Sequence, residues 1–175
     1  MNGNPFLGWN GNLYNESKAF VYEHQVLFNK DRTTLIAYTS KDTNYIIPDG
    51  VINIGDKAFY GCSSLTSISI PNSVTNIGDE TFWGCESLTN INIPNSVTNI
   101  GDGTFSLCKS LTKINIPNSV TNIGDRAFNE CTSLTNINIP DSVTNIGKSA
   151  FWRCDNLPSK IQSNIINRFG EKVFE

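Results

Sequence analysis

The sequence is short of the residues from which catalytic and metal sites are built. Its 175 residues include one histidine, His24, and five cysteines that form no close pair such as Cys-x-x-Cys. It also lacks a nucleophile beside a base, a unique pair of carboxylates and a glycine-rich phosphate loop. We therefore expect a protein that is not an enzyme, with no cofactor and no metal site.

Strongly charged stretches and long hydrophobic runs are missing too. Lys and Arg at 13 positions and Asp and Glu at 16 give a formal net charge of -3, and the signs are interspersed. Neither nucleic acid nor an anionic membrane is indicated as a partner. No apolar stretch approaches the roughly 20 residues of a membrane span. The opening MNGNPFLGWNGNL lacks the regions of a signal peptide. We expect Met1 to begin a piece cut from a longer protein, with any export signal or anchor outside it.

What the sequence has in abundance is an internal repeat of 23 residues. The nearly identical copies align on Ile-Pro pairs: Ile47-Pro48, Ile70-Pro71, Ile93-Pro94, Ile116-Pro117 and Ile139-Pro140. A fixed period of this length is typical of a solenoid, in which copies too small to bury their own apolar faces stack on one another. The stack exposes long regular surfaces rather than a cleft, which favours binding or spacing over catalysis.

Apolar residues recur at fixed places in each copy and are predicted to form the core. The columns begin at Val51, Ile54, Phe59, Leu65 and Ile68 and recur with the same period. Segments 66–70, 89–93, 112–116 and 135–139 alternate polar and β-branched apolar residues, as half-buried strands do. Stacked in register, they predict a parallel sheet with neighbouring strands about 4.8 Å apart.

The rest of each copy is predicted to be turns. A Val-x-x-Ile turn is followed by Gly, usually Asp, and a short run such as AFYGC that is expected to form one or two helical turns. The Asp residues stand where helix N-caps would be. They are Asp56, Asp79, Asp102 and Asp125. Lys148 replaces Asp in the fifth copy, so capping is favoured over cation binding.

The repeat IPNSVTNIGDETFWGCESLTNIN, residues 70–92, resembles the BspA-type leucine-rich repeat of bacterial surface proteins. The resemblance rests on the Pro, Gly, Ala-Phe, Cys and Ser-Leu-Thr positions, and five copies cover well over half the chain. It implies a leucine-rich-repeat solenoid, a right-handed β/α superhelix with a parallel β-sheet on one face and short helical turns on the other.

The flanking segments are predicted to cap this array. VLFNKDRTTLIAY, residues 26–38, has two apolar runs joined by a polar turn and predicts a β-hairpin. Near the other end, Pro158 and Gly170 mark the start and stop of an amphipathic helix. The predicted organisation is an N-terminal segment with a hairpin cap (1–46), five repeats with the last truncated (47–157) and a C-terminal capping helix (158–175).

The cysteines all fall at one repeat position. They are Cys62, Cys85, Cys108, Cys131 and Cys154. Because their number is odd and they lie a full period apart, they are interpreted as buried free thiols rather than a disulfide ladder or a metal site. A glycosylation sequon at Asn15-Glu16-Ser17 is a lone and weak match.

Two classes of surface residue are candidates for binding a protein. The first points outward from the strands: Asn90, Asn92, Lys113, Asn115, Asn136 and Asn138, with Ser67 and Ser69 in the first of these strands. These side chains form either a stabilising amide ladder or a platform for a protein or glycan. The second class follows the core Phe and varies between copies: Tyr60, Trp83, Trp152 and Arg153. Such aromatics either anchor an interface or cover a neighbouring repeat.

What the resemblance implies is a protein-binding module of an adhesin-type protein, at the cell surface or secreted. It would attach as a monomer to host or neighbouring-cell proteins, and matrix proteins such as fibronectin and fibrinogen are typical partners of BspA-like proteins. The alternative is a rigid spacer within a larger surface protein, with no ligand of its own.

Overall fold

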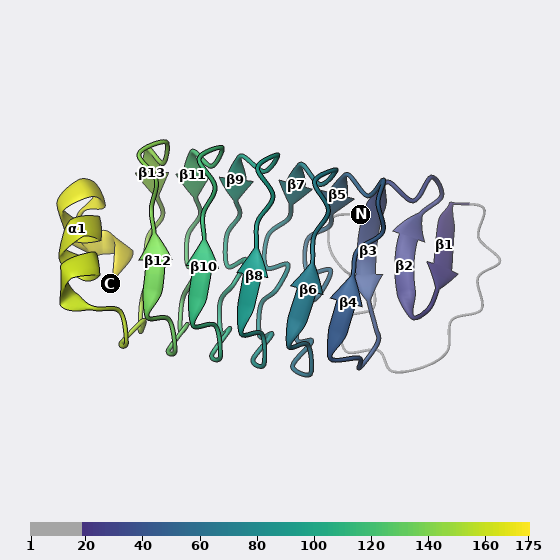
Figure 1. The fold of residues 1–175 in the computed structure, drawn as a ribbon, viewed down its shortest axis with the longest axis horizontal. Helices are drawn as coiled ribbons and strands as arrows, with labels where there is room; N and C mark the ends of the chain where they lie inside the picture. The colour runs from purple at the N-terminus through teal and green to yellow at the C-terminus, as the bar shows by residue number, and fades with distance from the viewer. Residues whose placement is uncertain (1–18) are drawn as a thin grey trace.

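The structure, a computed structural model, describes residues 19–175. The sequon at 15–17 and residues 1–18 of the predicted N-terminal segment lie outside the described residues. The described chain is an elongated stack of similar rungs, with antiparallel strands at one end and a helix at the other (Figure 1). The repeat solenoid predicted from the sequence is confirmed.

One side of the stack is the predicted parallel sheet. Its strands are β4 (Asn44–Ile46), β6 (Ser67–Ser69), β8 (Asn90–Asn92), β10 (Lys113–Asn115) and β12 (Asn136–Asn138). Each pairing is in register at one repeat period, as between Ile114 and Ile137. The ladder is interrupted between β6 and β8, which leaves pairings β4–β6 and β8–β10–β12. The central Ile of each repeat strand is buried and its two neighbours are exposed, as the alternation predicts.

A second parallel ladder lies where the sequence predicted only turns. It consists of the two-residue Asn-Ile strands β5 (Asn53–Ile54), β7 (Asn76–Ile77), β9 (Asn99–Ile100), β11 (Asn122–Ile123) and β13 (Asn145–Ile146). The prediction of a simple turn was wrong here. Strands of two residues are too short to show the alternation by which strands are recognised in a sequence.

The third side, which we call the turn face, carries consecutive turns instead of the expected helical turns. Alternate amides bond to the next rung, as when Lys57 N–H donates to Asp79 O at 2.9 Å and Phe59 N–H donates to Thr81 O at 2.9 Å. Positive φ angles recur in each rung, at Lys57 (59°) and Gly61 (70°) in the first. Left-handed residues interrupt a right-handed helix, so these amides are free to join the rungs.

The Asp column caps the neighbouring rung rather than its own turn. Oδ1 of Asp79 accepts the backbone N–H of Asp102 at 2.9 Å, and Oδ1 of Asp125 accepts that of Lys148 at 2.7 Å. The prediction of N-caps was therefore wrong about the donor, because each carboxylate accepts an amide of the next rung and not one of its own turn. In the last rung this position only has to donate its backbone N–H to the Asp before it, so Lys148 can replace Asp there. The glycine before each Asp makes room, because a Cβ on Gly101 would overlap Oδ1 of Asp79.

The core is a set of stacked columns inside the rungs. Rings of Phe82, Phe105, Phe128 and Phe151 stack with centroids 5.4 to 5.5 Å apart. All five cysteines are free, as predicted, and four are buried while Cys62 is partly exposed. The thiol of Cys108 donates to the carbonyl of Phe82 in the preceding rung at 3.2 Å, so the thiols also join rungs.

The N-terminal end is closed by antiparallel strands. The predicted hairpin is formed by β2 (Val26–Asn29) and β3 (Thr34–Tyr38), and β1 (Phe20–Glu23) adds an outer strand to it. Strand β3 then pairs in parallel with β5, which joins the hairpin to the second ladder.

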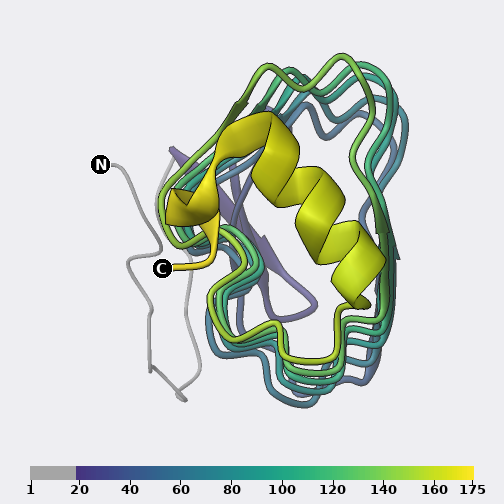
Figure 2. The same cartoon turned by 90° about the vertical axis from the view of Figure 1, so that its left-hand side faces the viewer.

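The C-terminal end is covered by α1 (Ser159–Phe169), which lies across the last rung (Figure 2). The guanidinium of Arg168 donates to the carbonyls of Ile139 at 2.7 Å and Pro140 at 3.0 Å. These bonds satisfy carbonyls that would otherwise face a missing rung.

After α1 the chain resumes the repeat. The 3₁₀ turn η1 (Glu171–Val173) bonds to the last rung, with Phe151 N–H donating to Val173 O at 2.8 Å. The ring of Phe174 packs 5.7 Å from that of Phe151, one full period after it. The sequence Gly-Glu-Lys-Val-Phe at 170–174 thus corresponds to Gly-Asp-Lys-Ala-Phe at 55–59. The sequence had predicted a helix stop at Gly170 but not this further copy of the turn.

Candidate functional site

The predicted outward residues of the strands lie together on one exposed surface. We call this the sheet face and define it as Ile46 with Ser67, Ser69, Asn90, Asn92, Lys113, Asn115, Asn136 and Asn138. Parallel in-register pairing aligns them in two columns that run along the stack. The structure therefore brings six of the predicted binding residues onto a single surface.

Asn side chains do form a row of hydrogen-bonded amides, but this row lies on the strands of the second ladder. The side chain of Asn122 donates to Asn99 at 2.6 Å, and Asn145 donates to Asn122 at 2.7 Å. Within residues 19–175, no amide-to-amide hydrogen bond joins the Asn side chains of β8, β10 and β12. The sheet face therefore presents amide donors and acceptors to solvent, whereas Asn99, Asn122 and Asn145 of the second ladder bond to one another.

Ile46 adds an apolar side chain to the sheet face that sequence reasoning missed. It is 76% exposed and lies in register with Ser69 at the end of β4. The signal was present in the sequence, because the first copy reads Ile-Ile-Pro where later copies read Ser-Ile-Pro or Asn-Ile-Pro.

On the turn face the predicted aromatics pack locally and also remain accessible. The rings of Tyr60 and Trp83 stack at 4.3 Å with an interplanar angle of 10°. Trp152 is 37% exposed, and the guanidinium of Arg153 lies 4.7 Å from its ring centroid. Arg153 in turn approaches the carboxylate of Glu130 at 4.0 Å. All four of these predicted residues are thus in contact with a neighbouring side chain.

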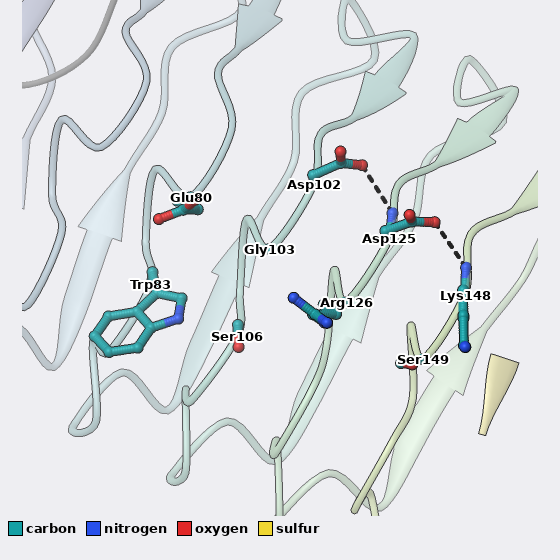
Figure 3. A pocket seen from close by; sticks show the side chains of 9 residues that line it. All are labelled: Glu80, Trp83, Asp102, Gly103, Ser106, Asp125, Arg126, Lys148 and Ser149. Atoms are coloured by element: carbon teal, nitrogen blue, oxygen red, sulfur yellow. Dashed lines mark hydrogen bonds between the residues drawn. The ribbon is translucent and has the colours of Figure 1, made fainter. Parts of the chain in front are cut away.

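Between the two tryptophans the same column holds small polar residues, Ser106 and Asn129, whose side chains lie 3.2 Å apart. This leaves two adjoining hollows, of about 410 Å³ and 580 Å³, that share Trp83, Ser106 and Arg126 among their lining residues. We call this region the tryptophan hollow. Figure 3 shows residues that line the first hollow, with Arg126 between Ser106 and Ser149, and with Asp102, Asp125 and Lys148 along one side.

Sequence reasoning named the two tryptophans but missed Arg126 and Lys148. These cations sit at repeat positions that hold other residues elsewhere, such as Glu80 in the column of Arg126. Only the stacked rungs bring them beside the indoles. The signal available in the sequence was that the residue at each of these two repeat positions is not the same in every copy.

The buried thiols offer no reactive nucleophile. Burial raises the pKa of Cys62 and of Cys154 to about 12, so both thiols are protonated at neutral pH. Among residues 19–175, His, Cys, Asp and Glu side chains form no group of three or more suited to a metal ion. The helices of this part of the chain are also too short or too polar to cross a membrane.

Two parallel ladders, a stacked aromatic core and a cap at each end define a leucine-rich-repeat solenoid. This architecture is a scaffold for protein interactions and is typically not enzymatic. The chain belongs to the BspA-type leucine-rich repeat family, whose model matches residues 36–175 with six copies. The matched range extends past the five copies at 47–157 into both ends of the array, including the turn at 170–174.

Solved structures of bacterial proteins share this fold. A leucine-rich repeat protein from Bacteroides ovatus is 37% identical, with a TM-score of 0.66, over 79% of this chain and 37% of its own length. A leucine-rich cell surface protein from Faecalibacterium prausnitzii is 29% identical, with a TM-score of 0.55, over 82% of this chain and 54% of its own. The pneumococcal vaccine antigen PcpA, at 21% identity and a TM-score of 0.69, covers 90% of this chain and 47% of its own and shares the fold. No curated protein matches the sequence.

These comparisons show a repeat module of the kind found in bacterial surface-type proteins. The chain spans little more than a third of the length of the Bacteroides ovatus protein.

Proposed function

We propose that the chain is a non-enzymatic protein-binding module of an adhesin-type protein, located at the cell surface or secreted. In this proposal it attaches as a monomer to host or neighbouring-cell proteins, with extracellular-matrix proteins as the first candidates. The binding surface is the sheet face. The observation that carries the proposal is the contrast between its amides, which face solvent, and those of Asn99, Asn122 and Asn145 in the second ladder, which bond to one another.

The composition of the sheet face supports recognition of a protein surface. Ile46 provides an exposed apolar contact at one end, Lys113 provides a positive charge near the middle, and the hydroxyls of β6 and the amides of β8 lie between them. Apolar anchors surrounded by hydrogen-bonding groups are typical of protein interfaces. The strands hold these groups on a rigid scaffold, so little conformational entropy is lost on binding.

The test measures binding of the chain to immobilised fibronectin and fibrinogen by surface plasmon resonance. We expect micromolar binding that weakens at least tenfold, about 1.4 kcal/mol, in Ile46→Asp and in Lys113→Glu. Trp83→Ala and Trp152→Ala, which alter the turn face, are the matched controls and should change Kd less than twofold. Thermal unfolding checks that every variant keeps the fold.

Two outcomes would contradict the proposal. If the unaltered chain binds neither these proteins nor a wider panel of matrix and cell-surface proteins at micromolar concentration, the role of a rigid spacer gains support. If the tryptophan variants abolish binding while the sheet-face variants do not, the protein-binding surface is the turn face.

A further inference from the structure

We propose that the tryptophan hollow is a second binding site, separate from the sheet face, and that it takes a neutral oligosaccharide. The first reason is the state of Trp83. One face of its indole is stacked on Tyr60 at 4.3 Å. The next rung carries Ser106 in the same column, so no ring of residues 19–175 stacks on the opposite side, and Trp83 lines both hollows. A pre-oriented indole next to an open space is a platform for a flat, weakly polar ligand face.

The second reason is the balance of charge around the hollow. Arg126 and Lys148 provide cationic donors, and Asp102 and Asp125 provide carboxylates. Each carboxylate uses Oδ1 for the backbone N–H of the next rung, which leaves its other oxygen able to accept from a ligand. Three more acidic residues line the two hollows. Lys57 approaches Glu80 at 3.4 Å and Arg153 approaches Glu130 at 4.0 Å, so cations offset both carboxylates, and the third is Glu175 at the edge of the second hollow.

This balance selects among ligand classes. An anion attracted by Arg126 would lie close to the two aspartates, and a cation attracted by the aspartates would lie close to Arg126 and Lys148. An apolar side chain of a protein partner would desolvate all four charged groups without pairing them. A sugar avoids each penalty, because its hydroxyl groups both donate and accept while the C–H face of its ring packs on an indole.

The third reason is the extent of the hollow. Trp83 and Trp152 are separated by three rung steps of about 5 Å each, with only Ser106 and Asn129 between them in the column. Trp152 lines the second hollow at its far side, and the guanidinium of Arg153 lies over the Trp152 ring. The space is therefore long enough for more than one sugar ring, with an indole at either end.

The test is isothermal titration calorimetry of the whole chain with neutral tetrasaccharides, namely cellotetraose, chitotetraose, maltotetraose and mannotetraose. A heparin tetrasaccharide serves as the anionic probe and chitosan tetrasaccharide as the cationic one. We expect at least one neutral probe to bind at submillimolar Kd and both charged probes to bind more than tenfold more weakly.

Variants then locate the bound probe. Trp83→Ala and Trp152→Ala should each weaken binding about tenfold or more, and Trp83→Phe should recover part of the loss because it keeps an aromatic platform. Arg126→Ala should weaken binding without disturbing the Tyr60 stack. Lys160→Ala, at an exposed position of α1 outside both surfaces, is the control and should leave Kd within twofold.

The proposal is overturned if no neutral probe binds at millimolar concentration, if a charged probe binds more tightly, or if binding is insensitive to both tryptophans. It is also overturned if the tryptophan variants instead abolish binding of a matrix protein, since the occupant would then be a protein. Matrix-protein binding that depends only on the sheet face would support the proposed function and leave this test unchanged.

Discussion

The contact between each Asp carboxyl and the glycine one rung further on distinguishes two glycines that look equivalent in the sequence. In Gly101→Ala the new Cβ would overlap Oδ1 of Asp79, and the next nearest atoms, Cα and Cγ of Asp79, would lie at 3.4 Å. In Gly124→Ala the Cβ would overlap Oδ1 of Asp102 and would also lie 2.7 Å from the backbone nitrogen of Asp102 and from the carbonyl carbon of Gly101. The first clash is with a side chain that can turn away. The second includes backbone.

These geometries give different energies. When the Asp79 side chain turns away, its bond to the Asp102 N–H is lost, so Gly101→Ala should cost about 1 to 2 kcal/mol. Gly124→Ala must move backbone in a packed stack and should cost about 3 kcal/mol, the upper end for overpacking. Asp79→Ala alone should cost about 1 kcal/mol, since water can reach the exposed amide.

The assay is a double-mutant cycle by urea unfolding followed by circular dichroism. Because Asp79→Ala removes the clashing atom, the double variant of Gly101 and Asp79 should be about as stable as Asp79→Ala. The equivalent double variant of Gly124 and Asp102 should stay close to Gly124→Ala, because its backbone clash persists. Equal costs for the two glycine variants, or equal rescue in the two cycles, would refute the distinction between side-chain and backbone contact.

Three further predictions concern other parts of the stack. Leu107 has φ 60° in a column where two copies have glycine, so Leu107→Gly should raise the free energy of unfolding by about 0.5 to 1 kcal/mol, whereas Leu107→Ala should not. Arg168→Ala leaves the carbonyls of the last rung unpaired and should lower the free energy of unfolding by about 1 to 2 kcal/mol, which lowers Tm by about 2 to 8 °C. The Tm of Arg168→Lys should fall between those of the unaltered chain and Arg168→Ala. An unchanged Tm in Arg168→Ala would mean that water replaces the guanidinium. Since burial raises the pKa of Cys62 and of Cys154 from 9.0 to about 12, the unfolded chain loses protons first as pH rises. Stability should therefore fall between about pH 9 and 12, and the Cys62→Ala and Cys154→Ala variants should flatten the slope in urea titrations.

The period predicted the fold because every column of the core repeats in the sequence. Phe82 and Ile114 could be assigned to the interior without a structure, since residues one period apart must occupy equivalent positions in a stack. The outward direction of Asn90 and Asn136 followed from strand alternation. These features depend on local pattern and on the period, and both are visible in one sequence.

Features that depend on contacts between rungs or between columns were missed or misassigned. Asp79 has the local signature of a helix N-cap, and its actual partner is one full period away. The last copy of the turn, ending at Phe174, is separated from the array by a helix in place of a strand and so escaped the alignment. The tryptophan hollow arises because Arg126 and Lys148 from different columns meet where Ser106 interrupts a row of rings. No single column contains that combination.

The way in which the C-terminal cap binds the last rung has a consequence for evolution. Phe174 and the 3₁₀ turn use the same stacking and hydrogen bonds that one rung uses with the next. A cap of this kind fits any rung, however many precede it, so duplication or loss of one repeat in the gene would lengthen or shorten the molecule by about 5 Å without creating a new interface. Array length can therefore drift in a lineage while the ends stay sealed, and a surface carried on one rung can be moved closer to or further from its neighbours by recombination alone.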